Sequence, residues 1–142
     1  MKVQLKDVMS KNLTTVGVHT PVSLVATIFA NSTFHHIPVV DDHQRLKGII
    51  SKTDFERIKS GISLFRNPKL EAYNESLFRT LLTSDIMTMN VIEMRPEDSI
   101  ELAYKVFSKN KIRALPIVDK GKLVGIVTPL DLLDFFFQTE IV

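Results

Sequence analysis

The stretch Leu123-Val124-Gly125-Ile126-Val127-Thr128-Pro129-Leu130-Asp131 decides the fold, because Leu46-Lys47-Gly48-Ile49-Ile50-Ser51-Lys52-Thr53-Asp54 repeats its pattern earlier in the chain. Each stretch is typical of a short apolar strand that runs into a helix. Thr128 suits the N-cap, Pro129 suits the first helical position, and Asp131 then falls at the third. Ser51 and Asp54 have the same spacing. A hydroxyl and a carboxylate placed in this way can cap the helix or hold a polar ligand.

The repetition extends over most of the chain. Asp7-Val8-Met9 recurs as Asp85-Ile86-Met87, an offset of 78 residues that becomes 77 after one extra residue in the turn at 41–44. Further matched pairs are Asn12 with Asn90, Leu24 with Leu102, Phe29 with Phe107, Pro38 with Pro116, and Val40-Asp41 with Val118-Asp119. Similarity in register over this length indicates two copies of one supersecondary unit. We therefore predict an α/β (α+β) fold of two β-α-β-β-α repeats, packed about a pseudo-twofold axis into one compact module.

The local patterns predict the elements of each copy. In the first copy we expect strands at 13–16 and 37–40, a helix beginning at Thr20-Pro21, and then the strand and helix of the opening motif. The second copy should have strands at 91–94 and 115–118 and a helix beginning at Asp98-Ser99. The two apolar helix stripes are Val22, Val25, Ala26 and Phe29, and Leu102, Ala103, Val106 and Phe107.

Between the copies, apolar residues near helical spacing follow the break at Asn67-Pro68 and predict a bridging helix. They are Leu70, Tyr73, Leu77, Leu81 and Leu82. The predicted boundaries are 7–60 for the first repeat, 61–84 for the helical linker and 85–139 for the second repeat.

Composition excludes several classes of protein. The chain has 142 residues, 44% of them apolar and 24% charged, so it should form a globular domain. Its net charge is only +2, which argues against the basic surface that binds a nucleic-acid backbone. It has no cysteine, hence no disulfide or thiol chemistry. The N-terminus lacks the apolar run of a signal peptide, and no stretch approaches the roughly 20 apolar residues of a membrane span. We expect a cytoplasmic protein.

The closing helix of the second copy is apolar on nearly every face over residues 130–137. A monomer could cover only one of these faces, so the sequence predicts a homodimer through the terminal helices. The alternative is that Phe135, Phe136 and Phe137 pack over the chain's own core.

The chain resembles a pair of cystathionine-β-synthase (CBS) domains from Asp7 to about Phe137. Besides the Asp-Val-Met and Asp-Ile-Met openings, the resemblance rests on the strands His36-Ile37-Pro38-Val39-Val40-Asp41 and Ala114-Leu115-Pro116-Ile117-Val118-Asp119 and on the paired Gly-Ile-Ile-Ser-x-x-Asp and Gly-Ile-Val-Thr-x-x-Asp segments. It implies a regulatory module that binds AMP, ADP, ATP or, in some members, S-adenosylmethionine in clefts between the repeats. A stand-alone ligand-sensing protein with an unknown downstream partner is the function it implies.

The resemblance also nominates ligand-binding residues. The motif aspartates Asp54 and Asp131 would accept hydrogen bonds from the ribose hydroxyls, and Ser51 and Thr128 would help to bind phosphate. Backbone around the first strand and the proline strand would frame adenine, which adds Thr14, Thr15 and Ile37 in the first copy and Ile92, Glu93 and Leu115 in the second. Basic residues before the proline strand would meet phosphates, namely His35 and His36 in one copy and Arg113 in the other.

The chemistry of these residues fits such a ligand. A carboxylate can accept both hydroxyl protons of a vicinal diol, and a helix start favours phosphate. Arg113 is always charged, whereas the two histidines are largely uncharged at pH 7, so the side of Arg113 is expected to favour the more anionic ligand. The alternative is that both Ser/Thr-x-x-Asp segments are capping boxes of a ligand-free, dimerising scaffold protein.

Two other kinds of site are not supported. His35, His36 and His43 lie near Asp41 and Asp42, but adjacent residues of a strand point to opposite faces, so we expect no metal. No catalytic triad, pair of acids or glycine-rich phosphate loop is evident, and we predict no enzymatic activity. Asp41-Asp42 and Glu56-Arg57 are interpreted as solvated charges.

Overall fold

The computed structural model describes residues 3–62 and 78–140. Contacts divide the chain into two units, each containing the sheet of one copy. The first-copy unit comprises Thr14–His43 and Lys47–Asn90, and the second-copy unit comprises Met1–Leu13, Gln44–Leu46 and Val91–Val142.

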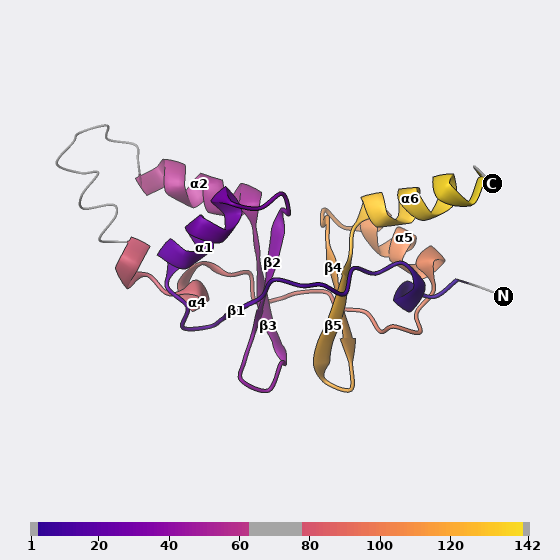
Figure 1. Cartoon of the computed structure of the whole chain (residues 1–142), viewed down its shortest axis with the longest axis horizontal. Coiled ribbons are helices and arrows are strands. Elements are labelled where there is room, and N and C mark those ends of the chain that lie inside the picture. The colour runs from indigo at the N-terminus through magenta and orange to yellow at the C-terminus, as the bar shows by residue number, and fades with distance from the viewer. Residues whose placement is uncertain (1–2, 63–77, 141–142) are drawn as a thin grey trace. The chain divides into compact units, whose positions relative to one another are not determined.

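The first-copy unit is built on a sheet with the strand order β1-β2-β3. Its elements are β1 (Val16–Gly17), α1 (Val22–Ala30), β2 (His36–Val40), β3 (Leu46–Ser51), α2 (Lys52–Ile62) and α4 (Thr83–Ile86). β1 runs parallel to β2, with Val16 opposite Val39. Figure 1 shows α1 and α2 together on one side of this sheet.

The second-copy unit contains the antiparallel hairpin of β4 (Leu115–Asp119) and β5 (Lys122–Val127). The hairpin turn consists of Lys120 and Gly121, whose φ angles of 52° and 82° are typical of the two-residue turns that match strand twist. The other elements are the short 3-10 helix η1 (Leu5–Asp7), α5 (Ile100–Lys109) and α6 (Pro129–Glu140), and α5 packs against α6. Figure 1 shows both helices near the same end of the hairpin.

The structure confirms the mixed fold class and most predicted elements, but the first strand of each copy is shorter than predicted. Only Val16–Gly17 is a strand in the first copy, and the second has a single bridge between Met94 and Ile117. Each of these segments pairs with its neighbouring strand over only one or two residues. Most of the predicted bridging helix lies outside the described residues, although residues 78–80 are helical.

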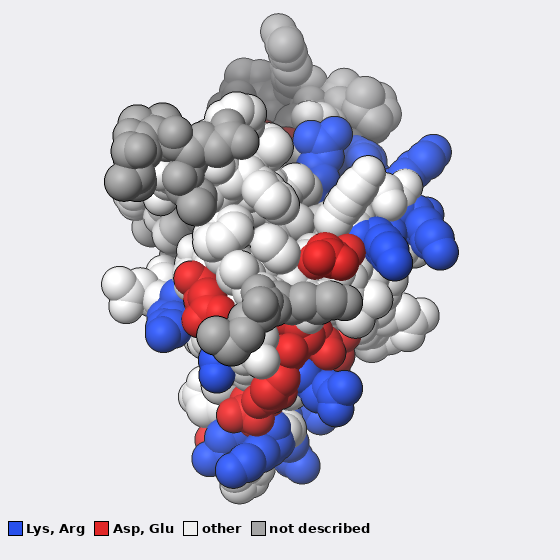
Figure 2. Space-filling view, turned by 90° about the vertical axis from the view of Figure 1, so that its right-hand side faces the viewer, with Lys and Arg blue, Asp and Glu red and all other residues white. Residues whose placement is uncertain are grey.

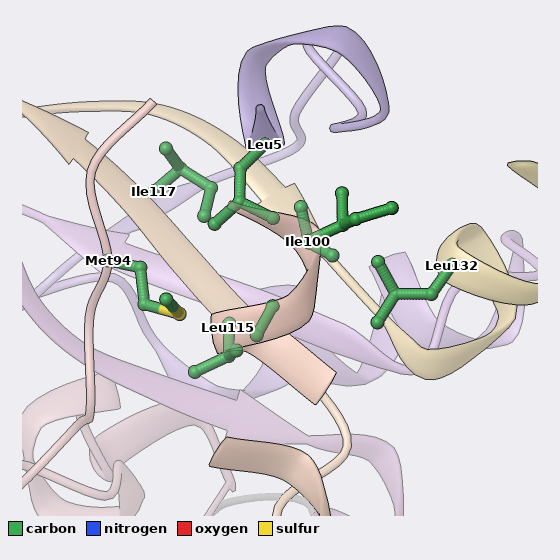
Figure 3. Close-up of a cluster of buried hydrophobic side chains, with 8 residues drawn as sticks. Leu5, Met94, Ile100, Leu115, Ile117 and Leu132 are labelled. Carbon is green, nitrogen blue, oxygen red and sulfur yellow. The ribbon is translucent and has the colours of Figure 1, made fainter. Parts of the chain in front are cut away.

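Each unit has its own hydrophobic core. The first is made of Val16, Val22, Val25, Phe29, Ile37, Val39, Ile50 and Phe55. The second is made of Leu5, Met94, Ala103, Ile100, Leu115, Ile117, Val127 and Leu132; Figure 3 shows Leu5 of η1 beside Ile117 of β4. The predicted helix stripes supply much of both cores, with one error: Leu102 is 45% exposed and lies outside the stripe.

The Asp-x-Met openings of the two copies are exchanged between the cores. Met9 packs on Gly125 of β5, where an added Cβ would lie 2.5 Å from the Met9 sulfur. Reciprocally, Met87 packs on Gly48 of β3, where an added Cβ would lie 2.7 Å from the sulfur. Backbone bonds between Ser10 and Ile126 and between Ile49 and Thr88 accompany these contacts. Gly48 and Gly125 are therefore needed for the close packing of the two methionines.

Candidate ligand site

The start of α6 is a closed capping box. The Thr128 amide donates to Asp131 Oδ2 at 2.8 Å, and the Asp131 amide donates to Thr128 Oγ1 at 3.3 Å. Both residues are half-buried, and Pro129 occupies the first helical position as predicted. The Asp131 carboxylate is thus already oriented by backbone at the positive end of a helix.

The start of α2 has the same residues with different bonds. The Asp54 amide donates to Ser51 Oγ at 3.0 Å, which repeats one half of the box. The Asp54 carboxylate instead forms an ion pair with Arg57, whose Nη1 lies 3.4 Å from Asp54 Oδ1. This carboxylate is 45% exposed. It can therefore accept hydrogen bonds from solvent or from a ligand.

In the first-copy unit, three segments meet at the end of the sheet where α2 begins. The Lys52 amide donates to the His35 carbonyl at 2.7 Å, so the residue before β2 touches the first residue of α2. The parallel register of Val16 with Val39, continued backwards, places Thr14 level with Ile37. The structure thus brings the nominated residues of the first copy to one edge of one sheet.

The second-copy unit repeats this arrangement. The Met94 amide donates to the Pro116 carbonyl at 3.0 Å, and the Val118 amide donates to the Met94 carbonyl at 2.8 Å. Continued backwards, this parallel register places Ile92 level with Leu115. Leu115 is in turn opposite Val127, the residue before Thr128.

Burial separates side chains that can face a ligand from those that cannot. Ile37 and Leu115 are fully buried in the two cores, so their side chains cannot face a ligand. Thr14, His35, Glu93 and Arg113 are exposed, while Thr15 and His36 are half-buried. The residues that can approach a ligand are therefore the polar side chains at the helix start, in the first strand segment and just before the proline strand.

The described residues include three ion pairs that were not predicted from the sequence, namely Arg57 with Asp54, Lys47 with Asp41, and Arg95 with Asp98. Arg57 was interpreted as a solvated charge, but it pairs with Asp54 one turn earlier, and the spacing of three residues was the available signal. Asp41 lies 3.8 Å from the Lys47 ammonium. Lys52, at the first position of α2, was also not singled out.

The described residues also bear on other kinds of site. Among residues 3–62 and 78–140, no group of three or more His, Cys, Asp or Glu side chains is arranged to hold a metal ion. None of the helices described is long and apolar enough to cross a membrane. Figure 2 shows basic residues in separate groups that alternate with acidic ones on the face that it displays.

Comparison with known families identifies the architecture. The model of the CBS domain matches the chain twice, at residues 5–61 and 84–138. The chain belongs to the CBS domain family. A CBS domain-containing protein of Dictyostelium discoideum is 32% identical over 142 residues, which is 97% of this chain and 94% of that protein. The inosine-5'-monophosphate dehydrogenase of Thermoplasma acidophilum is 30% identical over 90% of this chain, which spans only 22% of that enzyme.

Solved CBS pairs share the fold. CBSX2, a CBS-pair protein of Arabidopsis thaliana, has been crystallised in complex with AMP; that structure has a TM-score of 0.78, is 25% identical, and covers 96% of this chain and 98% of its own. Another CBS domain pair, in complex with 5'-methylthioadenosine and S-adenosyl-L-methionine, has a TM-score of 0.76 and 28% identity, with coverage of 98% and 99%. Structural relatives of this chain thus bind adenosine-containing ligands.

Proposed function

We propose that this CBS pair is a regulatory module that binds adenosine-containing ligands through the edges where α2 and α6 begin. Asp54 and Asp131 accept hydrogen bonds from the ribose hydroxyls, and the Ser51 and Thr128 side chains contact phosphate or other polar groups. The ligand would bind one conformation of the protein more tightly than another and so shift their populations. A downstream partner would respond to that shift. Neither ligand binding nor the response of a partner to it requires the chain to be an enzyme.

The observation that supports this proposal most strongly is that each unit gathers its own motif residues at one sheet edge. In the first copy, the bond from Lys52 to His35 joins the proline strand to the helix that carries Asp54. In the second, the pairing of Leu115 with Val127 brings the proline strand to the helix that carries Asp131. The AMP, 5'-methylthioadenosine and S-adenosyl-L-methionine found in related structures supply the ligand class.

Ligand-induced stabilisation tests the proposal. A ligand that binds only the folded chain raises the free energy of unfolding by about 2.7 kcal/mol at a hundredfold excess over Kd. We expect AMP, ADP, ATP or S-adenosylmethionine to raise the melting temperature, and the Asp54→Asn, Asp131→Asn double variant to lose the shift. Asn keeps the size of Asp and one acceptor oxygen. No shift with any of these ligands, or a shift that the double variant retains, would favour the ligand-free scaffold.

The surface of α6 supports a homodimer as a second part of the proposal. Leu132 and Phe135 pack into the chain's own core, which confirms part of the alternative prediction for this helix. Leu130, Leu133, Phe136 and Phe137 nevertheless remain 52–63% exposed. Large apolar side chains gathered on one helix mark an interaction surface, and a second copy of the chain is the occupant that we propose.

Sedimentation tests this dimer. Leu133→Glu with Phe137→Glu should convert the dimer to a monomer, because both substitutions place charges in the apolar contact. Met89→Glu is the matched control, since Met89 is 70% exposed and belongs to the first-copy unit. A wild-type chain that sediments as a monomer at micromolar concentration would disprove the dimer.

A further inference from the structure

The helix α1 lies in a long stretch of the chain that carries no charge. Residues 13–40 contain no Asp, Glu, Lys or Arg, although 24% of the whole chain is charged. The matched residues 91–118 of the second copy contain nine charged residues, namely Glu93, Arg95, Glu97, Asp98, Glu101, Lys105, Lys109, Lys111 and Arg113. Surfaces that remain in water are usually rich in charge, and the centres of protein interfaces are depleted of it. The outward side of α1 is therefore a candidate for contact with another protein surface.

The residues on that side expose apolar surface, and their polar groups bond within the helix. Leu24 is 49% exposed, and Thr27, Ile28 and Asn31 follow it at helical spacing, so we call these four residues the α1 face. Thr27 Oγ1 donates to the Ser23 carbonyl at 3.1 Å, and Asn31 Nδ2 donates to the Thr27 carbonyl at 2.9 Å. Because these donors are already paired, covering the α1 face costs fewer hydrogen bonds to water.

The helix α6 exposes a stripe of large apolar side chains that suits such a face. Leu130, Leu133 and Phe137 are spaced by three and four residues, and they are 52–63% exposed. Asp134 borders this stripe, one turn after Leu130. A contact between two α6 helices would bring two Asp134 side chains to one narrow interface, where like charges repel. The α1 face has no charge and does not repel Asp134.

The area that a stable dimer needs also favours a contact that includes α1. A large apolar side chain has about 200 Å² of surface, so Leu130, Leu133, Phe136 and Phe137 together offer about 400–500 Å². Each partner in an interface of standard size buries about 800 Å². Two α6 helices in contact with each other alone therefore fall short. If α6 of each copy instead covers α1 of the other, every copy contributes the surface of two helices.

We infer that the α1 face is the docking surface for α6 of a second copy of the chain. The contact forms twice about a two-fold axis, α1 of each copy with α6 of the other, so the assembly closes at a dimer. This inference rests on the proposed homodimer and names the surface that receives α6. The second copy offers no equivalent face, because Lys105 and Lys109 of α5 stand where α1 has Thr27 and Asn31.

Thiol cross-linking on the full chain tests the inference, because the natural sequence has no cysteine and introduced thiols are the only ones present. The double variant Thr27→Cys, Leu133→Cys is treated with a short bis-maleimide and separated on a denaturing gel. We expect a covalent dimer from the double variant and little from either single variant. Lys105→Cys with Leu133→Cys is the matched control, since residue 105 of α5 corresponds to residue 27 of α1, and it should give little covalent dimer.

A matched pair of charge substitutions provides a second test. Thr27→Glu should raise the Kd of the dimer at least tenfold in sedimentation equilibrium, because it places a charge in the α1 face beside Asp134 of the other copy. Lys105→Glu introduces the same residue at the matched position of α5 and should change the Kd by about twofold or less. Circular dichroism melting of both variants is the control for folding.

The outcomes separate this inference from the homodimer itself. Covalent dimers from Leu133→Cys alone at the yield of the double variant would show an α6–α6 contact and overturn the docking on α1. A wild type that sediments as a dimer but gives no cross-link in the double variant, or is weakened equally by Thr27→Glu and Lys105→Glu, would overturn it as well. In each of these cases the homodimer stands. A wild type that sediments as a monomer would overturn both.

Discussion

The starts of α2 and α6 are the same motif with the same spacing, yet their aspartates are bonded differently. Asp131 accepts from the Thr128 amide and closes a capping box, whereas Asp54 pairs with Arg57 on the helix surface. A Ser/Thr-x-x-Asp segment therefore does not by itself determine whether its carboxylate stabilises the helix or remains available. The residue one turn later, Arg in one copy and Asp in the other, contributes to the outcome.

The largest effect should come from the matched core residues Ile37 and Leu115. Both are fully buried in equivalent strands, so Ile37→Ala and Leu115→Ala should each lower the free energy of unfolding by about 2–5 kcal/mol. Chemical denaturation of the two variants measures this. Leu24→Ala is the control, since Leu24 is 49% exposed and should cost far less. A core variant that costs no more than this control would show that the two cores are not equivalent.

The exchanged methionine contacts should distinguish the copies next. A Cβ at Gly48 would lie 2.8 Å from the Thr88 carbonyl oxygen as well as against Met87, whereas at Gly125 the nearest atoms all belong to the Met9 side chain. Gly48→Ala should therefore destabilise by about 1–3 kcal/mol and Gly125→Ala by less.

A second substitution sharpens this difference. Met9→Ala should largely relieve the cost of Gly125→Ala, because it removes the Met9 sulfur and Cγ and leaves only the Met9 Cβ, at 3.2 Å. Met87→Ala should not rescue Gly48→Ala, because the backbone oxygen of Thr88 remains in place. Melting temperatures of the double variants measure both effects, and equal rescue in the two copies would contradict the structure.

The capping bonds should produce a smaller difference. Asp131→Ala removes the acceptor for the half-buried Thr128 amide and should cost about 1 kcal/mol. Asp54→Ala removes an exposed ion pair and should cost about 0.5 kcal/mol or less. Urea denaturation without ligand compares the two. If Asp54→Ala costs as much as Asp131→Ala, the described difference between the helix starts has no energetic consequence.

The sequence predicted the repeated order of elements because strand and helix periodicity, proline positions and turn residues are local signals. Ser99, Pro129 and the β-branched strands are at their predicted places. The exchange of Met9 and Met87 between the cores could not be predicted, since it depends on which sheet each segment reaches. The matched openings Asp-Val-Met and Asp-Ile-Met marked these segments without indicating their partners.

The candidate site was predictable in its residues and less so in its bonds. Ser51, Asp54, Thr128 and Asp131 stand at helix starts as predicted, and their role in ligand binding remains a prediction. The pairing of Arg57 with Asp54 competes with capping, and that competition is decided by side-chain geometry beyond the motif. Complete burial of Ile37 and Leu115 likewise keeps their side chains away from any ligand, which the motif did not indicate.

The most direct test of the central claim is the change in backbone amide NMR signals when an adenosine ligand is added to the labelled full chain. The account predicts that residues 51–54, residues 128–131, or both shift with saturable dependence on ligand concentration. It also predicts that Asp54→Asn and Asp131→Asn each abolish the shifts at their own helix start. Unchanged spectra with AMP, ATP and S-adenosylmethionine, or shifts confined to residues far from both helix starts, would contradict it.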